Sequence, residues 1–163
     1  MEMLARWLPT TPEMEVKILF GRHVWDCAQH ADHLGKRAFE LRAPLQYTLA
    51  AVPECQSLLS DVAALMPTTD RVSAFYGILC PSVTRQYEAY VRNTDPLLDE
   101  PTVRILEQAL RDYARMSSEC DRYAGSLRRE AAAQLPDAFA RGEALTQIVA
   151  HSRDVHHARG SAA

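Results

Sequence analysis

The sequence has 163 residues, of which 47% are hydrophobic and 24% are charged, as in an ordinary globular domain. Its formal net charge of −3 argues against the basic field that binds nucleic acids or anionic membranes, and no run of about 18 apolar residues could span a bilayer. We therefore expect one domain over residues 1–163, with its core between about 10 and 130, and neither nucleic acid nor membrane among its partners.

The cysteines indicate the cellular compartment. They lie far apart without a CxxC pair, at Cys27, Cys55, Cys80 and Cys120. Residues 1–9 lack the basic and apolar parts of a signal peptide. The sequence therefore favours reduced thiols in a cytoplasmic protein.

The pattern of apolar residues is helical almost throughout, because hairpin dipeptides and β-branched alternation are scarce. Thr10-Thr11-Pro12-Glu13 is typical of a helix start with a hydroxyl N-cap. The helix that follows runs to about Arg42, before Pro44.

Prolines and capping residues predict the later helices at about 53–66, 68–92 with a kink near Pro81, 99–130 and 142–150. Residues from about 131 onward are expected to be partly disordered and to end in a flexible tail. Long helices joined by short links favour an all-α, antiparallel four-helix-type bundle with a short C-terminal helix.

The predicted first helix carries polar groups on its apolar face. At 100° per residue, His23, Asp26 and His30 fall on the stripe that its apolar residues occupy, and Arg37 joins them. The apolar members of this stripe are Val16, Leu19, Phe20, Cys27, Leu34, Ala38 and Leu41. Because an unpaired buried polar group costs a few kcal/mol, the three groups require a metal, a ligand, water or a polar network. His23, Asp26 and His30 are therefore the candidate catalytic residues.

The opposite face of the same helix is also apolar. Met14, Ile18 and Trp25 gather there, and a helix that is apolar on two sides lies either at the centre of its bundle or in a subunit contact. Trp25 is the candidate anchor of a homodimer interface. The alternative is that Trp25 packs under the C-terminal segment.

The other helices offer side chains to the polar stripe. In the third helix, Tyr76, Tyr87 and Tyr90 share the apolar side; their hydroxyls either bond to the His/Asp groups, line a substrate pocket with Arg37, or lie at the rim of the core. In the fourth helix, Glu107 is the carboxylate best placed to reach inward, and a solvated flank is the alternative. The core side of that helix is predicted at Val103, Leu106, Leu110, Ala114, Ser117 and Ala124.

A bundle with a long first helix and inward histidine and carboxylate groups resembles the ferritin-like superfamily over roughly residues 10–130. The resemblance is architectural: members hold a di-metal site with glutamates and Glu-x-x-His motifs, and this chain has no Glu-x-x-His. Its nearest local arrangements are His23-Val-Trp-Asp26 and Asp26-Cys-Ala-Gln-His30. These residue types allow a divergent mononuclear site of His23, Asp26, His30 and Glu107, because they suit Fe(II) or Zn as ligands. If a metal is bound, the resemblance implies oxidative chemistry.

Two functions are consistent with these features. The first is a small enzyme that acts on a small organic substrate in a pocket between the first and third helices, with His23, Asp26 and His30 as metal ligands or acid/base groups. The second is a non-catalytic helical partner protein, whose inward groups form a structural polar network and whose Trp25 face binds another chain. The sequence favours the first, and it reveals neither the substrate nor the reaction.

Overall fold

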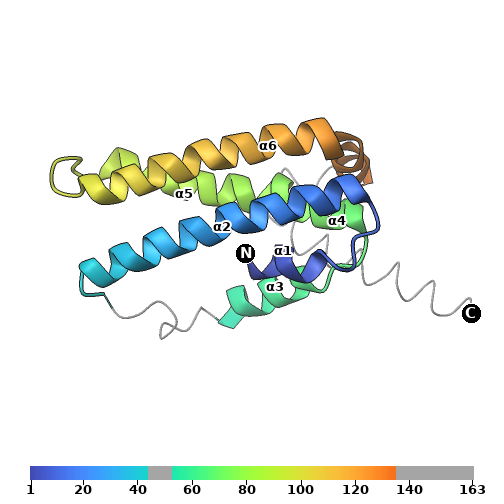
Figure 1. Ribbon diagram of the computed structural model, residues 1–163, viewed down its shortest axis with the longest axis horizontal. Helices are drawn as coiled ribbons and strands as arrows, with labels where there is room; N and C mark the ends of the chain where they lie inside the picture. The colour runs from blue at the N-terminus through green and yellow to red at the C-terminus, as the bar shows by residue number, and fades with distance from the viewer. Residues whose placement is uncertain (44–52, 135–163) are drawn as a thin grey trace, which may run out of the picture.

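The computed structural model describes residues 1–43 and 53–134, and every regular element within these ranges is a helix (Figure 1). The predicted all-α class is therefore confirmed. In chain order, the helices are α1 (Glu2–Trp7), α2 (Met14–Glu40), α3 (Pro53–Ala63), α4 (Thr68–Val72), the π-helical η2 (Ser73–Leu79), α5 (Cys80–Asn93) and α6 (Glu100–Gln134). Not one of these described helices is both long enough and apolar enough to cross a bilayer.

Three long helical bodies lie side by side: α2, α6 and the continuous run α4–η2–α5 (Figure 1). Helix α6 packs on both of the others and runs antiparallel to them. The short helices α1 and α3 pack on each other, and α1 also packs on α2. The predicted second bundle helix is thus a short one beside α1, and the ferritin-like four-helix arrangement stays a prediction. The predicted helix near 142–150 and the predicted tail lie outside the described residues.

The start of α2 differs from the prediction. Glu13 precedes the helix in an extended conformation, and no side chain caps the helix. The hydroxyls of Thr10 and Thr11 instead donate to the carbonyl oxygen of Trp7 at 3.2 and 2.8 Å. They therefore close α1, and the predicted hydroxyl N-cap of α2 is wrong. Glu13 accepts a 2.6 Å hydrogen bond from Thr68, which ties the start of α2 to the start of α4.

Helix α2 ends in a Schellman motif, two residues before the predicted end. The backbone N–H of Ala43 donates to the carbonyl of Ala38 at 3.0 Å, and that of Arg42 donates to Phe39 at 2.9 Å, the pattern that satisfies the last carbonyls of a helix. Arg42 has a φ of 56°, in the left-handed region where such turns place their C′ residue.

The predicted kink near Pro81 takes the form of a π-helical segment, η2. The backbone N–H of Cys80 donates to the carbonyl of Phe75, five residues earlier. Pro81 has no N–H, and its ring would collide with the carbonyl of Gly77 in a regular α-helix. The wider π turn just before the proline relieves this conflict, and such turns occur at functional sites more often than elsewhere.

The core extends into α1, which the sequence pattern did not predict. Leu4 and Trp7 are fully buried. The indole N–H of Trp7 donates to the carbonyl of Ala63 at 3.0 Å, and its ring lies 5.7 Å from that of Phe20. The buried guanidinium of Arg71 lies 5.9 Å from the same indole ring. Trp7 therefore joins α1 to α2, α3 and α4.

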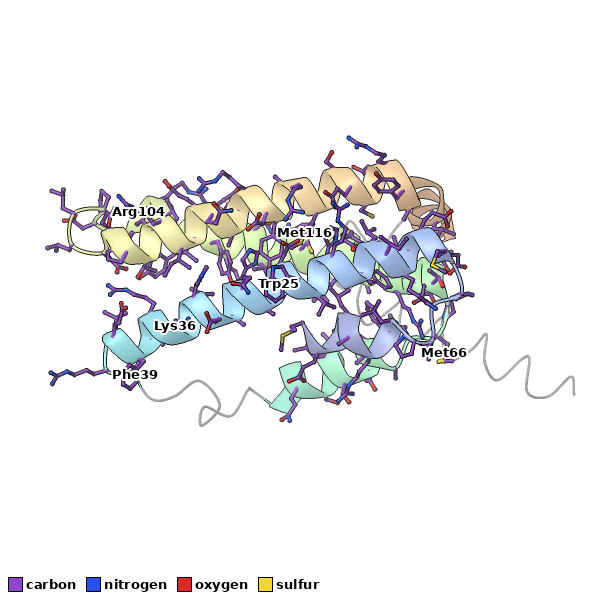
Figure 2. The ribbon with its side chains drawn as sticks, viewed as in Figure 1. Trp25, Lys36, Phe39, Met66, Arg104 and Met116 are labelled. Atoms are coloured by element: carbon purple, nitrogen blue, oxygen red, sulfur yellow. The ribbon has the colours of Figure 1, made fainter. Side chains whose placement is uncertain are left out.

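The core side of α6 differs from the predicted one. Leu106 and Ala124 are buried as predicted, whereas Ala114 is exposed. The buried positions are Thr102, Leu106, Ala109, Met116, Cys120, Ala124 and Gly125, and Met116 lies between α6 and α2 (Figure 2). The prediction is therefore wrong at Ala114 alone, since the remaining predicted positions, Val103, Leu110 and Ser117, are half-buried.

Candidate functional site

The three inward polar groups of α2 each meet a charged partner on α6. The pairs, which we call the α2–α6 ladder, are His23 with Glu119, Asp26 with Arg115, and His30 with Asp112. The predicted inward orientation is confirmed for both histidines, which are 0% and 5% exposed. The ladder occupies the interface between the two longest helices.

The spacing of the ladder follows from antiparallel packing. On α2 its members stand at positions i, i+3 and i+7, and on α6 they span the same seven residues in the opposite direction. Seven residues of α-helix rise roughly 10 Å. The two histidine pairs are therefore about two helical turns apart, too far for both imidazoles to bind one metal ion without unusual rotamers.

His23 is bonded at both ring nitrogens. Its Nε2 lies 3.1 Å from Oε2 of Glu119, and its Nδ1 lies 2.7 Å from the hydroxyl of Tyr76. Because an ionised carboxylate can only accept, Nε2 carries the proton, and Nδ1 accepts from the tyrosine hydroxyl. Every hydrogen-bonding atom of the neutral ring is then satisfied.

The pKa values agree with this assignment. Burial lowers the pKa of His23 below its ordinary value, and the hydrogen bond and charge of Glu119 only partly oppose the effect. Burial also raises the pKa of Tyr76 far above its ordinary value, so the hydroxyl keeps its proton. Burial alone would raise the pKa of Glu119, but the His23 hydrogen bond and the nearby arginines hold it below its ordinary value.

Arg115 joins the rungs of the ladder. Its Nη2 lies 2.9 Å from Oδ2 of Asp26 and 3.2 Å from Oδ1 of Asp112, and its Nη1 lies 3.6 Å from Oε1 of Glu119. Its side chain is 41% exposed, so solvent screens these ion pairs. Arg115 nevertheless provides one cation between three carboxylates.

His30 is bonded at one ring nitrogen only. Its Nε2 lies 3.0 Å from Oδ2 of Asp112, and its ring centroid lies 5.3 Å from that of Tyr113. Its Nδ1 is buried and has no hydrogen-bond partner. The Asp112 carboxylate is ionised, since the hydrogen bonds from His30 and its neighbours outweigh burial and lower its pKa. Nε2 of His30 therefore donates to Asp112, and Nδ1 is left without a partner.

The four predicted substrate-binding residues do not all lie together, and only Tyr90 and Arg37 share a partner. Tyr76 bonds to His23, and the half-buried Tyr87 has its ring 6.2 Å from that of Tyr113. Tyr90 lies near the other end of the molecule, where its hydroxyl donates to Asp99 at 2.7 Å.

Asp99 also forms an ion pair with Arg37, another predicted substrate-binding residue. Nη2 of Arg37 lies 2.8 Å from Oδ1 of Asp99, and its Nε donates to Thr102 at 2.9 Å. Asp99 further accepts from Thr102 at 2.6 Å. We call these four residues, Arg37, Tyr90, Asp99 and Thr102, the Asp99 cluster. It connects α2, α5 and the start of α6.

The predicted metal ligands do not form a metal centre. Glu107 is exposed on α6, and the described part of the chain contains no group of three or more His, Cys, Asp and Glu residues that could hold a metal ion. The side chains of His23, Asp26 and His30 follow one another along α2 at intervals of about one helical turn, so they do not converge on one point. The predicted Fe or Zn site therefore gains no support from the geometry.

The thiols agree with the expected reduced state within the described residues. Cys27, Cys80 and Cys120 are buried and are not joined in disulfides. Burial raises the pKa of the Cys27 thiol, which makes it a poorer nucleophile.

The predicted interface residues are exposed. Met14, Ile18 and Trp25 are 61%, 58% and 67% exposed, and Phe39 on the same face is 70% exposed. We call these four residues the outer stripe of α2. Figure 2 shows Trp25 near the middle of α2 and Phe39 near its C-terminal end.

Sequence reasoning missed the α6 half of the ladder. A signal for it was present: Asp112, Arg115 and Glu119 repeat the seven-residue span of the α2 groups with complementary charges in reverse order. Comparison of the chain with protein-family models, curated proteins and solved structures finds no match. The ferritin-like resemblance and the cytoplasmic location therefore stay predictions.

Proposed function

We propose that this protein is a non-catalytic helical partner protein, which acts by binding another protein chain through the outer stripe of α2. The observation that supports this proposal is the pairing of all three inward groups of α2 with charged partners on α6. This pairing is what a structural polar network requires, and it accounts for the inward groups without a substrate.

Burial supports the same conclusion. A general acid or base must come within hydrogen-bond reach of the substrate, and both His23 and Tyr76 are almost fully enclosed. Buried polar groups at a helix interface can instead fix which residues face one another. In this protein the ladder sets the rotation of α2 about its own axis, and so directs Met14, Ile18 and Trp25 outward.

A crosslinking experiment tests the binding function. A photo-reactive amino acid at position 18, in the full chain expressed in cells, should give a discrete protein adduct. The control is the same residue at position 104, because the Arg104 side chain is 78% exposed on α6 and lies away from the outer stripe. No adduct at position 18, or equal adducts at both positions, would contradict the proposal.

Metal analysis tests the proposal that the protein is not a metal-dependent enzyme. We expect tag-free protein to contain no stoichiometric metal before or after the His30→Ala substitution. Stoichiometric Fe or Zn that is lost in His30→Ala would overturn the proposal in favour of an enzyme.

His30 supports a second candidate function. A histidine held by a carboxylate at one nitrogen, with a lone pair at the other, is the arrangement of a general base. Asp112 would orient the ring, and a small organic substrate would need to reach Nδ1 beside Tyr113. A fragment screen followed by ¹⁵N NMR of the histidine rings tests this candidate: a ligand that shifts the Nδ1 signal of His30 supports it, and a screen without such ligands argues against it.

A further inference from the structure

The outer stripe of α2 has charged residues along one flank. Glu15 and Arg22 lie on the same side of the stripe, since they are seven residues, or about two helical turns, apart. Both are exposed, and Arg22 has only a distant ion pair, 3.6 Å from Glu119. The other flank borders α1, where Leu8 lies 3.7 Å from the position of a Cβ on Gly21.

The stripe and its flank are self-complementary in the antiparallel direction. When two such helices face each other about a twofold axis perpendicular to them, each flank meets the same flank of the other copy in reverse order. Glu15 then lies opposite Arg22 of the second copy, around a centre between residues 18 and 19. Met14 lies opposite Trp25 around a centre between residues 19 and 20.

The two centres agree within one residue, and Ile18 lies beside both. The apolar pair of Met14 with Trp25 and the charged pair of Glu15 with Arg22 use different residues, yet both favour the same register. Antiparallel helices also place opposite ends of their dipoles together.

We propose that the partner bound by the outer stripe is a second copy of this chain, in an antiparallel α2–α2 contact centred near residue 19. The proposal rests on the proposed function, and it names the partner and the register. In the dimer, Trp25 of each copy covers Met14 of the other, and Glu15 pairs with Arg22 on both sides of the axis.

Engineered disulfides test the register. Ile18→Cys should give a covalent dimer on mild oxidation, because the two Ile18 positions lie within about one helical turn of each other. Phe39→Cys should not, because the two Phe39 positions would be roughly 60 Å apart along the helix axes. The unsubstituted chain under the same oxidation provides the background from its native cysteines. Equal crosslinking at both positions, or crosslinking at Phe39→Cys alone, would overturn the antiparallel register.

A charge exchange tests the contact itself. Sedimentation equilibrium of the unsubstituted protein should give about twice the 18.3 kDa chain mass. The Trp25→Ala variant should have a dissociation constant for the dimer that is at least tenfold larger. Glu15→Arg and Arg22→Glu should each weaken the dimer, and the doubly exchanged chain should recover most of its affinity. Thermal melting at low concentration checks that each variant is folded, and Lys36→Glu is the matched control because Lys36 lies beyond the contact.

The outcomes separate this inference from the proposed function. A chain that stays monomeric at all concentrations, but still gives a heavier adduct with another protein at position 18, overturns the second copy as partner and leaves the binding function standing. A monomer without any adduct overturns both. A dimer that Glu15→Arg with Arg22→Glu fails to restore overturns the proposed pairing.

Discussion

His23 is the residue whose surroundings are most completely determined. Glu119 accepts from its Nε2 and Tyr76 donates to its Nδ1, so the neutral ring fits and a second ring proton would meet a hydroxyl already used as a donor. Desolvation by burial also disfavours the charged ring and lowers the pKa of His23. The native state therefore binds a proton at His23 less readily than the unfolded chain does.

We predict that the protein loses stability as the pH falls below about 6.5. A group whose pKa is lower in the folded state stabilises the fold fully above its unfolded value, about 6.5 for histidine, and this contribution is lost as the pH falls through that value towards the lower folded pKa. Urea unfolding at pH 8, 6 and 5 measures the effect. The His23→Gln variant should show a shallower decrease over this range, and an identical slope in both proteins would contradict the prediction.

We predict that Tyr76→Phe lowers the free energy of unfolding by about 1–3 kcal/mol, because it leaves Nδ1 of His23 buried without a donor. Tyr87→Phe is the matched control on the same helical body. Its hydroxyl lies in a half-buried side chain, and we expect a change below about 0.5 kcal/mol. Chemical denaturation of both variants provides the comparison, and equal losses would mean that the Tyr76 hydrogen bond contributes little.

The sequence predicted the α2 residues of the histidine contacts but not their partners on α6. The inward orientation of His23 and His30 followed from the phase of a long amphipathic helix, because 27 residues define a face well. Their partners did not follow, because the pairing of residues 82 and 96 positions apart depends on how two helices are aligned. Among the three tyrosines, only Tyr76 bonds to the histidines, since Tyr90 lies beyond the ladder.

At the scale of the helices, the ladder defines the alignment of α2 with α6. A shift of α6 by one turn would place Arg115 opposite a histidine and a carboxylate opposite Asp26, so both neighbouring alignments lose complementary charges. The kink between α4 and α5 followed from Pro81, whereas its π-helical form did not. Helix α1 was not predicted because its six residues are too few to show a helical period.

We predict a measurable coupling across the central rung. In a double-mutant cycle of Asp26→Ala and Arg115→Ala, the interaction free energy should be about 0.5–1 kcal/mol, modest because the Arg115 side chain is 41% exposed. Urea unfolding of the two single variants and the double variant gives the value. The exposed pair of Lys36 and Asp32 on α2 serves as control and should show less coupling. Additive losses at Asp26 and Arg115 would rule out a cooperative ladder.

At the scale of the whole molecule, the Asp99 cluster closes the end that lies away from α1. Its carboxylate receives hydrogen bonds from α2, α5 and α6, and these bonds lower the pKa of Asp99 to about 2. The cluster therefore stays charged over the whole ordinary pH range. It holds together three helices whose apolar contacts become sparse there, where Leu34 and Tyr87 are only half-buried.

We predict that Asp99→Ala loosens this end alone. Amide hydrogen exchange should become faster in the last turns of α2 and α5 and in the first turn of α6, and should be unchanged around Trp7. Exchange that accelerates equally in all helices would show that the cluster stabilises the whole fold instead. Glu107→Ala, on the exposed side of α6, is the control and should leave exchange unchanged.

The ladder also has a consequence for how this sequence can change over time. A substitution at one rung leaves a buried partner without its complement, so single changes at His30 or Asp112 are expected to be deleterious, whereas paired changes can preserve the contact. Related sequences, when compared, should therefore vary together at positions 23 and 119, 26 and 115, and 30 and 112. Positions on the solvent side of α6, such as Glu107, should vary independently.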